Sequence, residues 1–544
     1  MNPTKFRRRE FLLAGLALSA AACSGRQGED SVDVSSLPSK SKPGKFELEE
    51  LTLSGFQDGL KKGRWSIRKV VDLYLDRIEQ LDRQGPTLRC VIEINPRARE
   101  MADDLDREYR AKGPRGPFHG VPILLKDNIE TAGGMKTTAG SLALADFSID
   151  RDAFITHRVR KAGAVILGKT NLSEWANFRS THSSSGWSGR GGQTRNPYAL
   201  DRNPCGSSSG SGTAVSANLC LLAVGTETDG SIVCPSSTNG IVGIKPTLGL
   251  VSRRGIVPIA HSQDTAGPMA RTVWDAAALL GVLAGFDPRD PSTESGRGHL
   301  EQDYTKFLDS KGLQGARIGI VKGLGGFSPQ VEKIMEDCLS VMKRQGAWLV
   351  VPVEMPTLSK LDNPELEVLL YEFKAGLNAY LASLGSDAPV RTLKDLIEFN
   401  EKTRGKEMLW FGQELFLKAE AKGPLTEPAY RKARETCLRL SQKEGIDAVM
   451  GKHRLDALVA PTGGPAWMTD CVNGDHFTGG SSTAAAVSGY PAITVPAGFV
   501  HGLPVGITFF GRAFSEPILL RLAFTFEQAT RVRRPPQFLP SLPA

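Results

Sequence analysis

The sequence predicts one large α/β domain, and three observations lead to this fold class. Short apolar runs, such as residues 163–168 and 455–461, have the length and composition of buried strands. Between such runs, segments such as residues 66–78 carry apolar residues at helical spacing. Glycine-rich motifs continue across most of the 544 residues, and 40% of the residues are apolar, so we expect one core rather than several.

The first 23 residues have the composition of an export signal. Three arginines at 7–9 precede an apolar run at 11–22, which is too short to span a bilayer because about 20 residues are needed. The pattern resembles a twin-arginine signal, with a basic amino terminus beside an unrelated apolar run as the alternative. The residues around Cys23 resemble a lipobox, so Cys23 is a candidate for lipidation and cleavage near Ala22 is the alternative. We therefore expect an exported protein, periplasmic or anchored to the membrane as a lipoprotein.

Residues 24–46 are rich in serine, proline, glycine and charge, which is typical of a flexible tether. The catalytic domain is expected over residues 47–540. Its first clear element is a helix at 66–78, where Ser66 can cap the amino end and Val70, Tyr74 and Ile78 lie on one face.

An apolar, strand-like segment at 120–125 ends in Lys126. Lysine is rarely buried, so a surface lysine at a strand end is the interpretation that this segment alone favours. If Lys126 is instead buried beside hydroxyl groups, loss of hydration lowers its pKa from about 10.4. A neutral amine of that kind can accept a proton from serine.

Two segments, 205–211 and 225–231, combine glycine with serine and threonine. Such backbone can bring N–H groups close to a phosphate or to the oxyanion of an acyl-transfer intermediate. The phosphate-loop pattern fails because no lysine lies between Cys205 and Ile244. The Gly-x-Ser-x-Gly pattern fails because Asp229 and Val233 stand where that pattern around Ser231 needs glycines. A flexible linker is the remaining alternative, but the long apolar run at 213–224 indicates packed backbone.

The composition changes between about residues 288 and 452. Residues 317–321 and 348–352 are predicted strands, and residues 363–443 are charged and helical in pattern. This region carries none of the chemical motifs, so we expect it to vary and to shape access to the substrate site. The apolar segment 455–461 is expected to form a further strand of the core sheet.

Six motifs, taken together, resemble those of the amidase signature family of serine hydrolases. They lie in one order along the chain, at residues 120–128, 168–174, 206–210, 225–235, 240–247 and 489–506. The resemblance covers roughly residues 51–528. It implies one large mixed β-sheet covered by helices on both faces, and hydrolysis of a carboxamide without a metal or cofactor.

The resemblance also implies a catalytic triad. Ser231 is the expected acyl-enzyme nucleophile and Lys126 the general base. Ser207 is the expected bridging serine, preceded by a cis peptide bond. The backbone N–H groups of Thr228, Asp229 and Gly230 are the expected oxyanion hole, which acts by stabilising developing negative charge.

Departures from the common family pattern favour one branch. Many members have two glycines before the nucleophile, where this chain has Asp229 and Gly230. The chain is most similar to the peptide amidase branch, which removes ammonia from C-terminally amidated peptides. Trp175, Phe178 and Trp187 are candidates for lining an acyl pocket, with core packing as the alternative.

Histidine and cysteine narrow the alternatives. The eight histidines are scattered, which argues against a zinc hydrolase, although spacing alone leaves a Ser-His-Asp triad open. One disulfide among Cys205, Cys220 and Cys234 is an open prediction for an oxidising compartment. Cys205 as the nucleophile is disfavoured, because the family places glycine there.

The net charge of +8 does not by itself predict a nucleic-acid partner, because the basic residues are spread along the chain. The expected partner is a small-molecule or peptide amide, with a membrane tether only through Cys23, and the chain is expected to be a monomer or a simple homo-oligomer. Three alternatives stay open: a general aryl or aliphatic amidase or esterase, a component of an amidotransferase that modifies aminoacyl-tRNA, and a binding protein with an inactive site.

Overall fold

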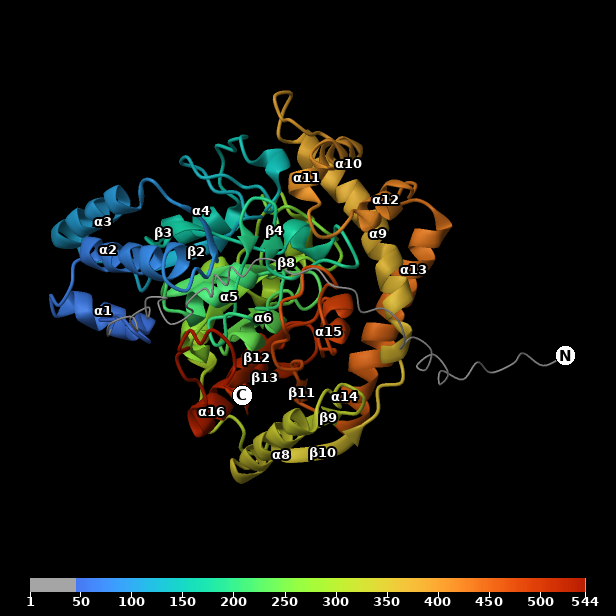
Figure 1. The fold of residues 1–544 in the computed structure, drawn as a ribbon. Helices are drawn as coiled ribbons and strands as arrows, with labels where there is room; N and C mark the ends of the chain where they lie inside the picture. The colour runs from blue at the N-terminus through green and yellow to red at the C-terminus, as the bar shows by residue number, and fades with distance from the viewer. Residues whose placement is uncertain (1–45, 544) are drawn as a thin grey trace, which may run out of the picture. The chain divides into compact units, whose positions relative to one another are not determined.

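A mixed β-sheet of eleven strands runs through the computed structural model, which describes residues 46–543 (Figure 1). In spatial order the strands are β1 (Val91–Ile94), β3 (Val165–Thr170), β2 (Pro122–Lys126), β6 (Leu222–Glu227), β8 (Thr265–Ala270), β7 (Val242–Lys245), β12 (Ala492–Val500), β13 (Leu503–Phe510), β11 (Ala457–Pro461), β9 (Arg317–Val321) and β10 (Trp348–Val353). A separate hairpin pairs β4 (Trp187–Ser188) with β5 (Gly192–Gln193). The predicted α/β class with one large mixed sheet is confirmed.

The strands that carry the site lie in the middle of this sheet. Strand β2 pairs in parallel with both β3 and β6, and β6 pairs antiparallel with β8. Every residue of β2, β3 and β6 is buried, so both faces of the sheet are covered here. This explains why these strands are continuous apolar runs rather than alternating ones.

Sixteen α-helices surround the sheet in the described residues. They are α1 (Leu53–Lys61), α2 (Ile67–Ile78), α3 (Ala98–Lys112), α4 (Phe154–Lys161), α5 (Ser209–Ser216), α6 (Val233–Thr238), α7 (Val273–Leu283), α8 (Pro329–Arg344), α9 (Asp362–Ala382), α10 (Leu393–Lys402), α11 (Arg404–Glu407), α12 (Glu414–Glu420), α13 (Pro428–Leu438), α14 (Asp447–His453), α15 (Thr483–Ser488) and α16 (Glu516–Thr530). Short 3₁₀ segments are η3 (Leu142–Leu144), η4 (Glu174–Asn177), η5 (Pro291–Glu294), η6 (Arg297–His299), η7 (Tyr304–Phe307) and η8 (Leu358–Lys360), and π segments are η2 (Glu79–Arg83) and η9 (Arg439–Ile446).

Helix α2 confirms the helix predicted at 66–78. The hydroxyl of Ser66 accepts a hydrogen bond from the backbone N–H of Lys69, as an N-cap residue does. The face that carries Val70, Tyr74 and Ile78 is buried. The same periodicity that predicted the helix therefore places its apolar face in the core.

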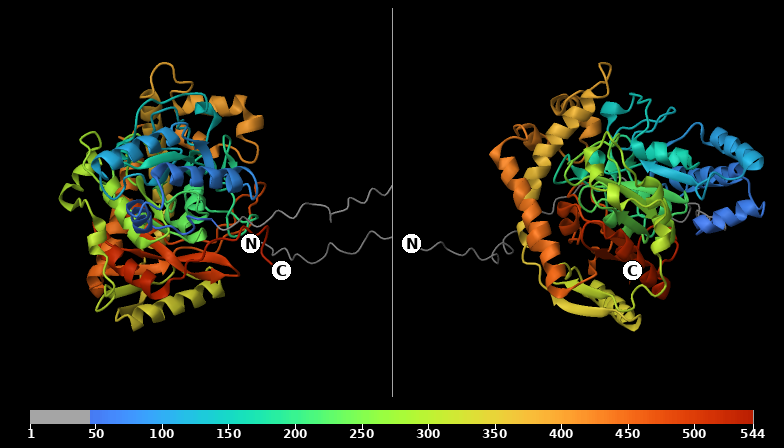
Figure 2. Two further views of the ribbon diagram at one scale, coloured as in Figure 1. Left: turned by 90° about the vertical axis from the view of Figure 1, so that its left-hand side faces the viewer. Right: turned by 180° about the vertical axis from the view of Figure 1, so that it is seen from behind.

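The predicted strands at 317–321 and 348–352 are β9 and β10, which extend one end of the sheet. The helices α9 to α13 form a layer on the opposite side of the described chain from α1 to α3, as the front and back views both show (Figures 1 and 2). Part of this layer packs on the central region, because Phe373 of α9 contacts Phe178.

The export signal, Cys23 and nearly all of the tether lie outside the described residues. Within residues 46–543, no helix combines the length and the apolar character needed to cross a bilayer.

Candidate active site

Lys126, the last residue of β2, is completely buried and contacts three hydroxyl groups. Its Nζ donates to Ser207 Oγ at 2.8 Å, to Thr226 Oγ1 at 2.9 Å and to Ser208 Oγ at 3.0 Å. A fourth contact, to the carbonyl oxygen of Thr226, is 3.2 Å long. The prediction of a surface position for Lys126, which the segment alone favoured, is therefore wrong, because the loop that carries Ser207 and Ser208 covers the end of the strand.

Burial changes the chemistry of this amine. Loss of hydration lowers the pKa of Lys126 to about 7, although the nearby carboxylates of Glu227 and Asp264 act in the opposite direction. An amine with a pKa in this range is partly neutral at physiological pH, and the neutral form can accept a proton.

Ser207 lies in the loop before α5, and the Gly206–Ser207 peptide bond is cis. A hydrogen bond joins this loop to the other glycine- and hydroxyl-rich segment, residues 225–231. The backbone N–H of Ser208 donates to the carbonyl oxygen of Ser231 at 3.1 Å. The hydroxyl of Ser208 also donates to the carbonyl oxygen of Thr226. The two segments that stood out in the sequence are thus neighbours in the fold.

Ser231 lies between β6 and α6, and the Glu227 side chain holds the two residues that follow it. The Glu227 carboxylate accepts from the backbone N–H groups of Ile232 at 2.7 Å and Val233 at 3.0 Å. A carboxylate at the amino end of a helix satisfies free N–H groups and complements the helix dipole. Gly230 has φ of 78°, a left-handed conformation that glycine adopts without strain. Ser231 itself is 7% exposed.

The expected oxyanion segment is held from several sides. Thr228 Oγ1 donates to Asp264 at 2.6 Å, and Gln263 Nε2 donates to the carbonyl oxygen of Thr228 at 3.3 Å. In the described chain, the backbone N–H groups of Thr228, Asp229 and Gly230 donate to no other group. All three expected donors are therefore available to a substrate oxygen.

A cavity of about 290 Å³ opens beside these loops. Gly206, Asp229 and Gly230 form part of its wall, and Trp467 and Phe477 form another part. A space of this size suits a small acyl group or one end of a larger chain.

Three aromatic residues predicted for an acyl pocket lie elsewhere. Trp175, Phe178 and Trp187 do not line the cavity; each is buried and packs on a phenylalanine, namely Phe416, Phe373 and Phe411 respectively. The packing alternative describes them better, since helices from distant sequence cover them. The aromatic residues at the cavity, Trp467 and Phe477, lie in the loop between β11 and α15, which no motif marked.

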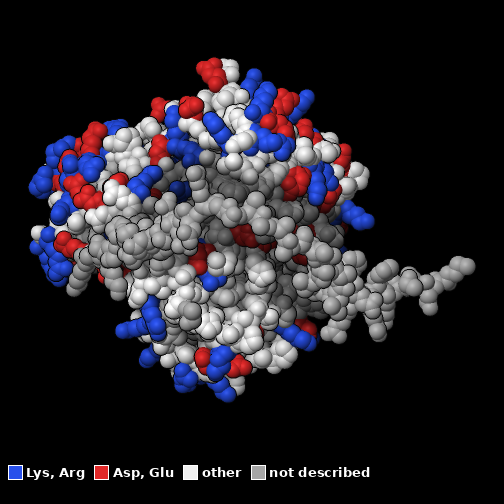
Figure 3. All heavy atoms as spheres, in the orientation of Figure 1, with Lys and Arg blue, Asp and Glu red and all other residues white. Residues whose placement is uncertain are grey.

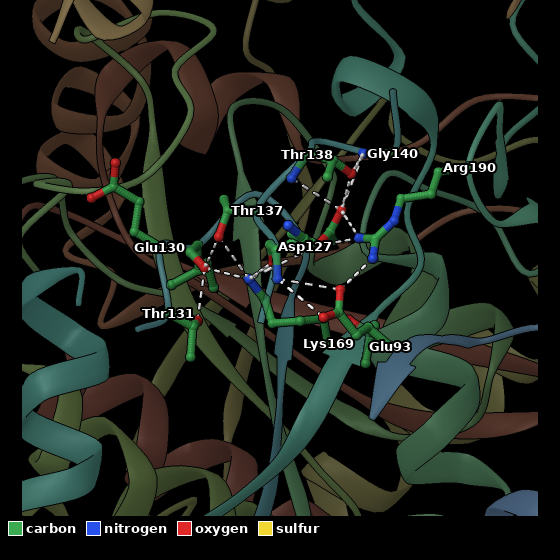
Figure 4. A network of polar contacts seen from close by, with 12 residues as sticks. Glu93, Asp127, Glu130, Thr131, Thr137, Thr138, Gly140, Lys169 and Arg190 are labelled. Atoms are coloured by element: carbon green, nitrogen blue, oxygen red, sulfur yellow. Dashed lines mark hydrogen bonds and ion pairs between the residues drawn. The ribbon is translucent and has the colours of Figure 1, made fainter. Parts of the chain in front are cut away.

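A buried polar network follows Lys126 directly (Figure 4). Asp127 lies 3.9 Å from Lys169 Nζ and 3.4 Å from Arg190 Nη1, and it accepts hydrogen bonds from Thr138 and the backbone N–H of Gly140. Burial lowers the pKa of Lys169 to about 8. These contacts join the ends of β2 and β3, and so they fix the end of the strand that carries Lys126.

A disulfide joins Cys205 to Cys234, with the Cα atoms 6.1 Å apart. Of the three cysteines left open, Cys220 is free and buried. The bridge connects the loop before Ser207 to the helix after Ser231. Because the Cys205 sulfur is bonded to that of Cys234, Cys205 has no free thiol and cannot be the nucleophile. It thus holds together the two loops that carry the expected serines.

Removing this bridge should weaken the fold. The two cysteines are 29 positions apart, and closing a loop of that length stabilises a fold by about 3 to 4 kcal/mol. The C205A/C234A variant is therefore expected to lose about that much free energy of unfolding. Chemical denaturation measures the loss. The C471S variant is the control, because Cys471 is free and partly exposed, and it should change stability by less than about 0.5 kcal/mol. Equal stability of C205A/C234A and the unmodified protein would contradict the bridge.

No histidine hydrogen-bonds to Ser207 or Ser231 in residues 46–543. The same residues contain no group of three or more histidine, cysteine, aspartate or glutamate side chains arranged to hold a metal ion.

Comparison with known proteins identifies the family of this chain. The amidase family model matches residues 69–520. The chain belongs to the amidase signature family. This amidase is 42% identical to a probable amidase of Arabidopsis thaliana, over 91% of this chain and 93% of that protein.

Among solved structures, this amidase is similar to peptide amidase PAM bound to the competitive inhibitor chymostatin, with a TM-score of 0.88 and 52% identity over 90% of this chain and all of that one. Native peptide amidase from Stenotrophomonas maltophilia gives a TM-score of 0.86 and 52% identity over 91% of this chain and all of that one. A glutamyl-tRNA(Gln) amidotransferase component from Halorhodospira halophila is 34% identical over 89% of this chain and 98% of that protein. The protein is therefore an amide-hydrolysing enzyme with a closer likeness to peptide amidases than to the amidotransferase component.

Proposed function

We propose that this amidase releases ammonia from C-terminally amidated peptides through an acyl-enzyme on Ser231. The observation that carries the proposal is the buried Lys126 amine at the end of β2, 2.8 Å from the hydroxyl of Ser207. The loop that carries Ser207 is in turn hydrogen-bonded to Ser231 through the backbone N–H of Ser208. The likeness to peptide amidases supports the choice of substrate.

The reaction begins with neutral Lys126. It takes the proton of Ser207, Ser207 takes that of Ser231, and Ser231 Oγ attacks the amide carbon. The backbone N–H groups of Asp229 and Gly230 stabilise the negative charge on the former carbonyl oxygen. The tetrahedral intermediate then collapses, Ser207 passes a proton to the leaving nitrogen and takes one back from Lys126, and ammonia departs with Lys126 neutral again. Water attacks the acyl-enzyme by the same relay, which yields the free acid and restores Ser231.

The pH dependence of the reaction should follow Lys126. Below a pKa of about 7 the amine is protonated and cannot accept a proton, so kcat/KM is expected to fall about tenfold for each pH unit below that value. Above it, the rate should level off. Ammonia release measured against pH at low substrate concentration tests this, and a rate that is flat from pH 5 to pH 8 would contradict the assigned base.

A substrate panel tests the proposed function. Ammonia release is compared for peptide amides, amides of free amino acids, and aryl or fatty amides of similar size. A preference for peptide amides is expected. A preference for aryl or fatty amides would instead favour the general amidase alternative.

The amidotransferase alternative has less support. On the face shown in Figure 3, the Lys and Arg side chains of the described residues are interspersed with Asp and Glu and form no wide basic surface. Activity that requires aminoacyl-tRNA and partner proteins would favour this alternative.

We also propose export through residues 1–23, which cell fractionation tests. An oxidising compartment would suit the disulfide.

A further inference from the structure

Two hollows adjoin beside the catalytic loops. The first is the cavity of about 290 Å³ described above, and the second has a volume of about 400 Å³. Asn177, Asp475 and Phe477 form part of the wall of both, so the hollows meet at these three residues. The rest of the second wall comes from residues 180–183 and 473–474, which are mostly polar. A chain bound at the catalytic loops can therefore continue from the first hollow into the second.

The carboxylate of Asp475 lies in the wall where the hollows meet. It accepts from the backbone N–H of Ser185 at 3.0 Å and from Trp467 Nε1 at 3.1 Å, and both of these residues also line the first hollow. Asn203 Nδ2 donates to the same carboxylate at 3.2 Å. Donors from three parts of the chain thus hold the carboxylate in place.

These donors leave room for another hydrogen bond on one oxygen. Within the described residues, Oδ1 of Asp475 accepts from all three donors, whereas Oδ2 receives only the Ser185 N–H, which it shares with Oδ1. Each oxygen of a carboxylate can accept about two hydrogen bonds. No lysine or arginine among residues 46–543 lines either hollow, so neither neutralises the carboxylate there. Oδ2 can therefore accept from a donor on a bound ligand.

A peptide amide carries the matching donor. Each residue of its acyl chain other than proline has a backbone N–H, whereas the acyl part of a simple aryl or fatty amide has none. Phe477 is 52% exposed and packs edge to face on Trp467, with the ring centroids 5.7 Å apart. Both rings line the first hollow and offer an apolar surface to a peptide side chain. The hollows thus present an acceptor for the backbone and an apolar surface for a side chain.

We propose that Asp475 determines specificity by accepting a hydrogen bond from a backbone N–H in the acyl chain of a peptide amide. The proposal rests on the proposed function, because it concerns the substrate of the same site. The bond selects peptides over amides that lack this N–H. By fixing the acyl chain, it also places the terminal amide beside the backbone N–H groups of residues 228–230. Asp475 contacts the substrate and takes no part in proton transfer.

The D475N variant of the full chain removes the charge and one of the two acceptor oxygens. A hydrogen bond to a charged group contributes about 10- to 100-fold to binding, so kcat/KM for a peptide amide should fall by about that factor. D470N is the matched control. Asp470 lies on the same loop and accepts from the backbone N–H groups of Val472 and Asn473, but it lines neither hollow. D470N should stay within about threefold of the unmodified protein.

Methylated substrates separate this contact from a merely structural role of Asp475. A series of N-acetylated tripeptide amides, each methylated at one backbone nitrogen, removes one N–H at a time. With the unmodified protein, methylation at one position should lower kcat/KM about 10- to 100-fold. With D475N, the same methyl group should lower it less than about threefold, because its partner is already lost. The difference between the two penalties measures the contact itself.

A methylation penalty that is the same in D475N and in the unmodified protein at every position would overturn the proposal. Asp475 would then only hold the loop. A loss of less than about threefold in D475N would overturn it as well. Both results leave peptide amides as substrates. A failure of the proposed function would instead appear as a substrate panel without a preference for peptide amides, or as activity that survives the loss of Ser231.

Discussion

The S231A variant should lose ammonia release almost completely, with kcat at least about 10⁴-fold below that of the unmodified protein. Without the hydroxyl no acyl-enzyme can form, and water would have to attack the amide directly. Release of ammonia from a peptide amide under single-turnover conditions measures the loss. The circular dichroism spectrum should be unchanged, because Ser231 lies at the end of a loop and its side chain is small.

A matched variant separates catalysis from packing in this region. Ser236 lies on α6, shortly after Ser231 in the chain, and its buried hydroxyl makes no hydrogen bond to any described residue. S236A therefore removes the same atom without touching the relay, and it should keep kcat within about threefold. If S231A and S236A lose activity equally, or S231A stays within about tenfold of the unmodified protein, the nucleophile has been assigned wrongly.

Local pattern in the sequence predicted much of the fold. Residues 66–78, 163–168 and 455–461 form the helix and the strands that their periodicity indicated, because each is a short segment whose apolar face or faces must be buried. Lys126 could be singled out because a charged residue at the end of an apolar run is unusual. Its burial could not be predicted from that segment, because burial depends on the loop that carries Ser207, 81 positions further along.

Contacts between distant segments account for the errors and the omissions. Trp175, Phe178 and Trp187 were candidates for an acyl pocket with core packing as the alternative, and they pack in the core because α9, α12 and the residues near Phe411 cover them. Trp467 and Phe477 have no neighbouring motif, and only the position of their loop brings them to the cavity.

A buried lysine such as Lys126 could serve the reaction in two ways, as a proton acceptor or only as a fixed positive charge. The K126M and K126R variants distinguish them. Methionine keeps the volume and removes the amine, whereas arginine keeps the charge but stays protonated at every accessible pH. If the amine works as a base, both variants should lose at least about 10³-fold in kcat, since general-base catalysis alone contributes about 10² to 10⁴ and the relay from Ser207 is also lost. Thermal unfolding should show that K126M remains folded, because it replaces a buried polar group by an apolar one. Activity of K126R within about tenfold of the unmodified protein would instead show that a positive charge beside Ser207 and Ser208 is what the reaction requires, and proton transfer would then have to begin at another group.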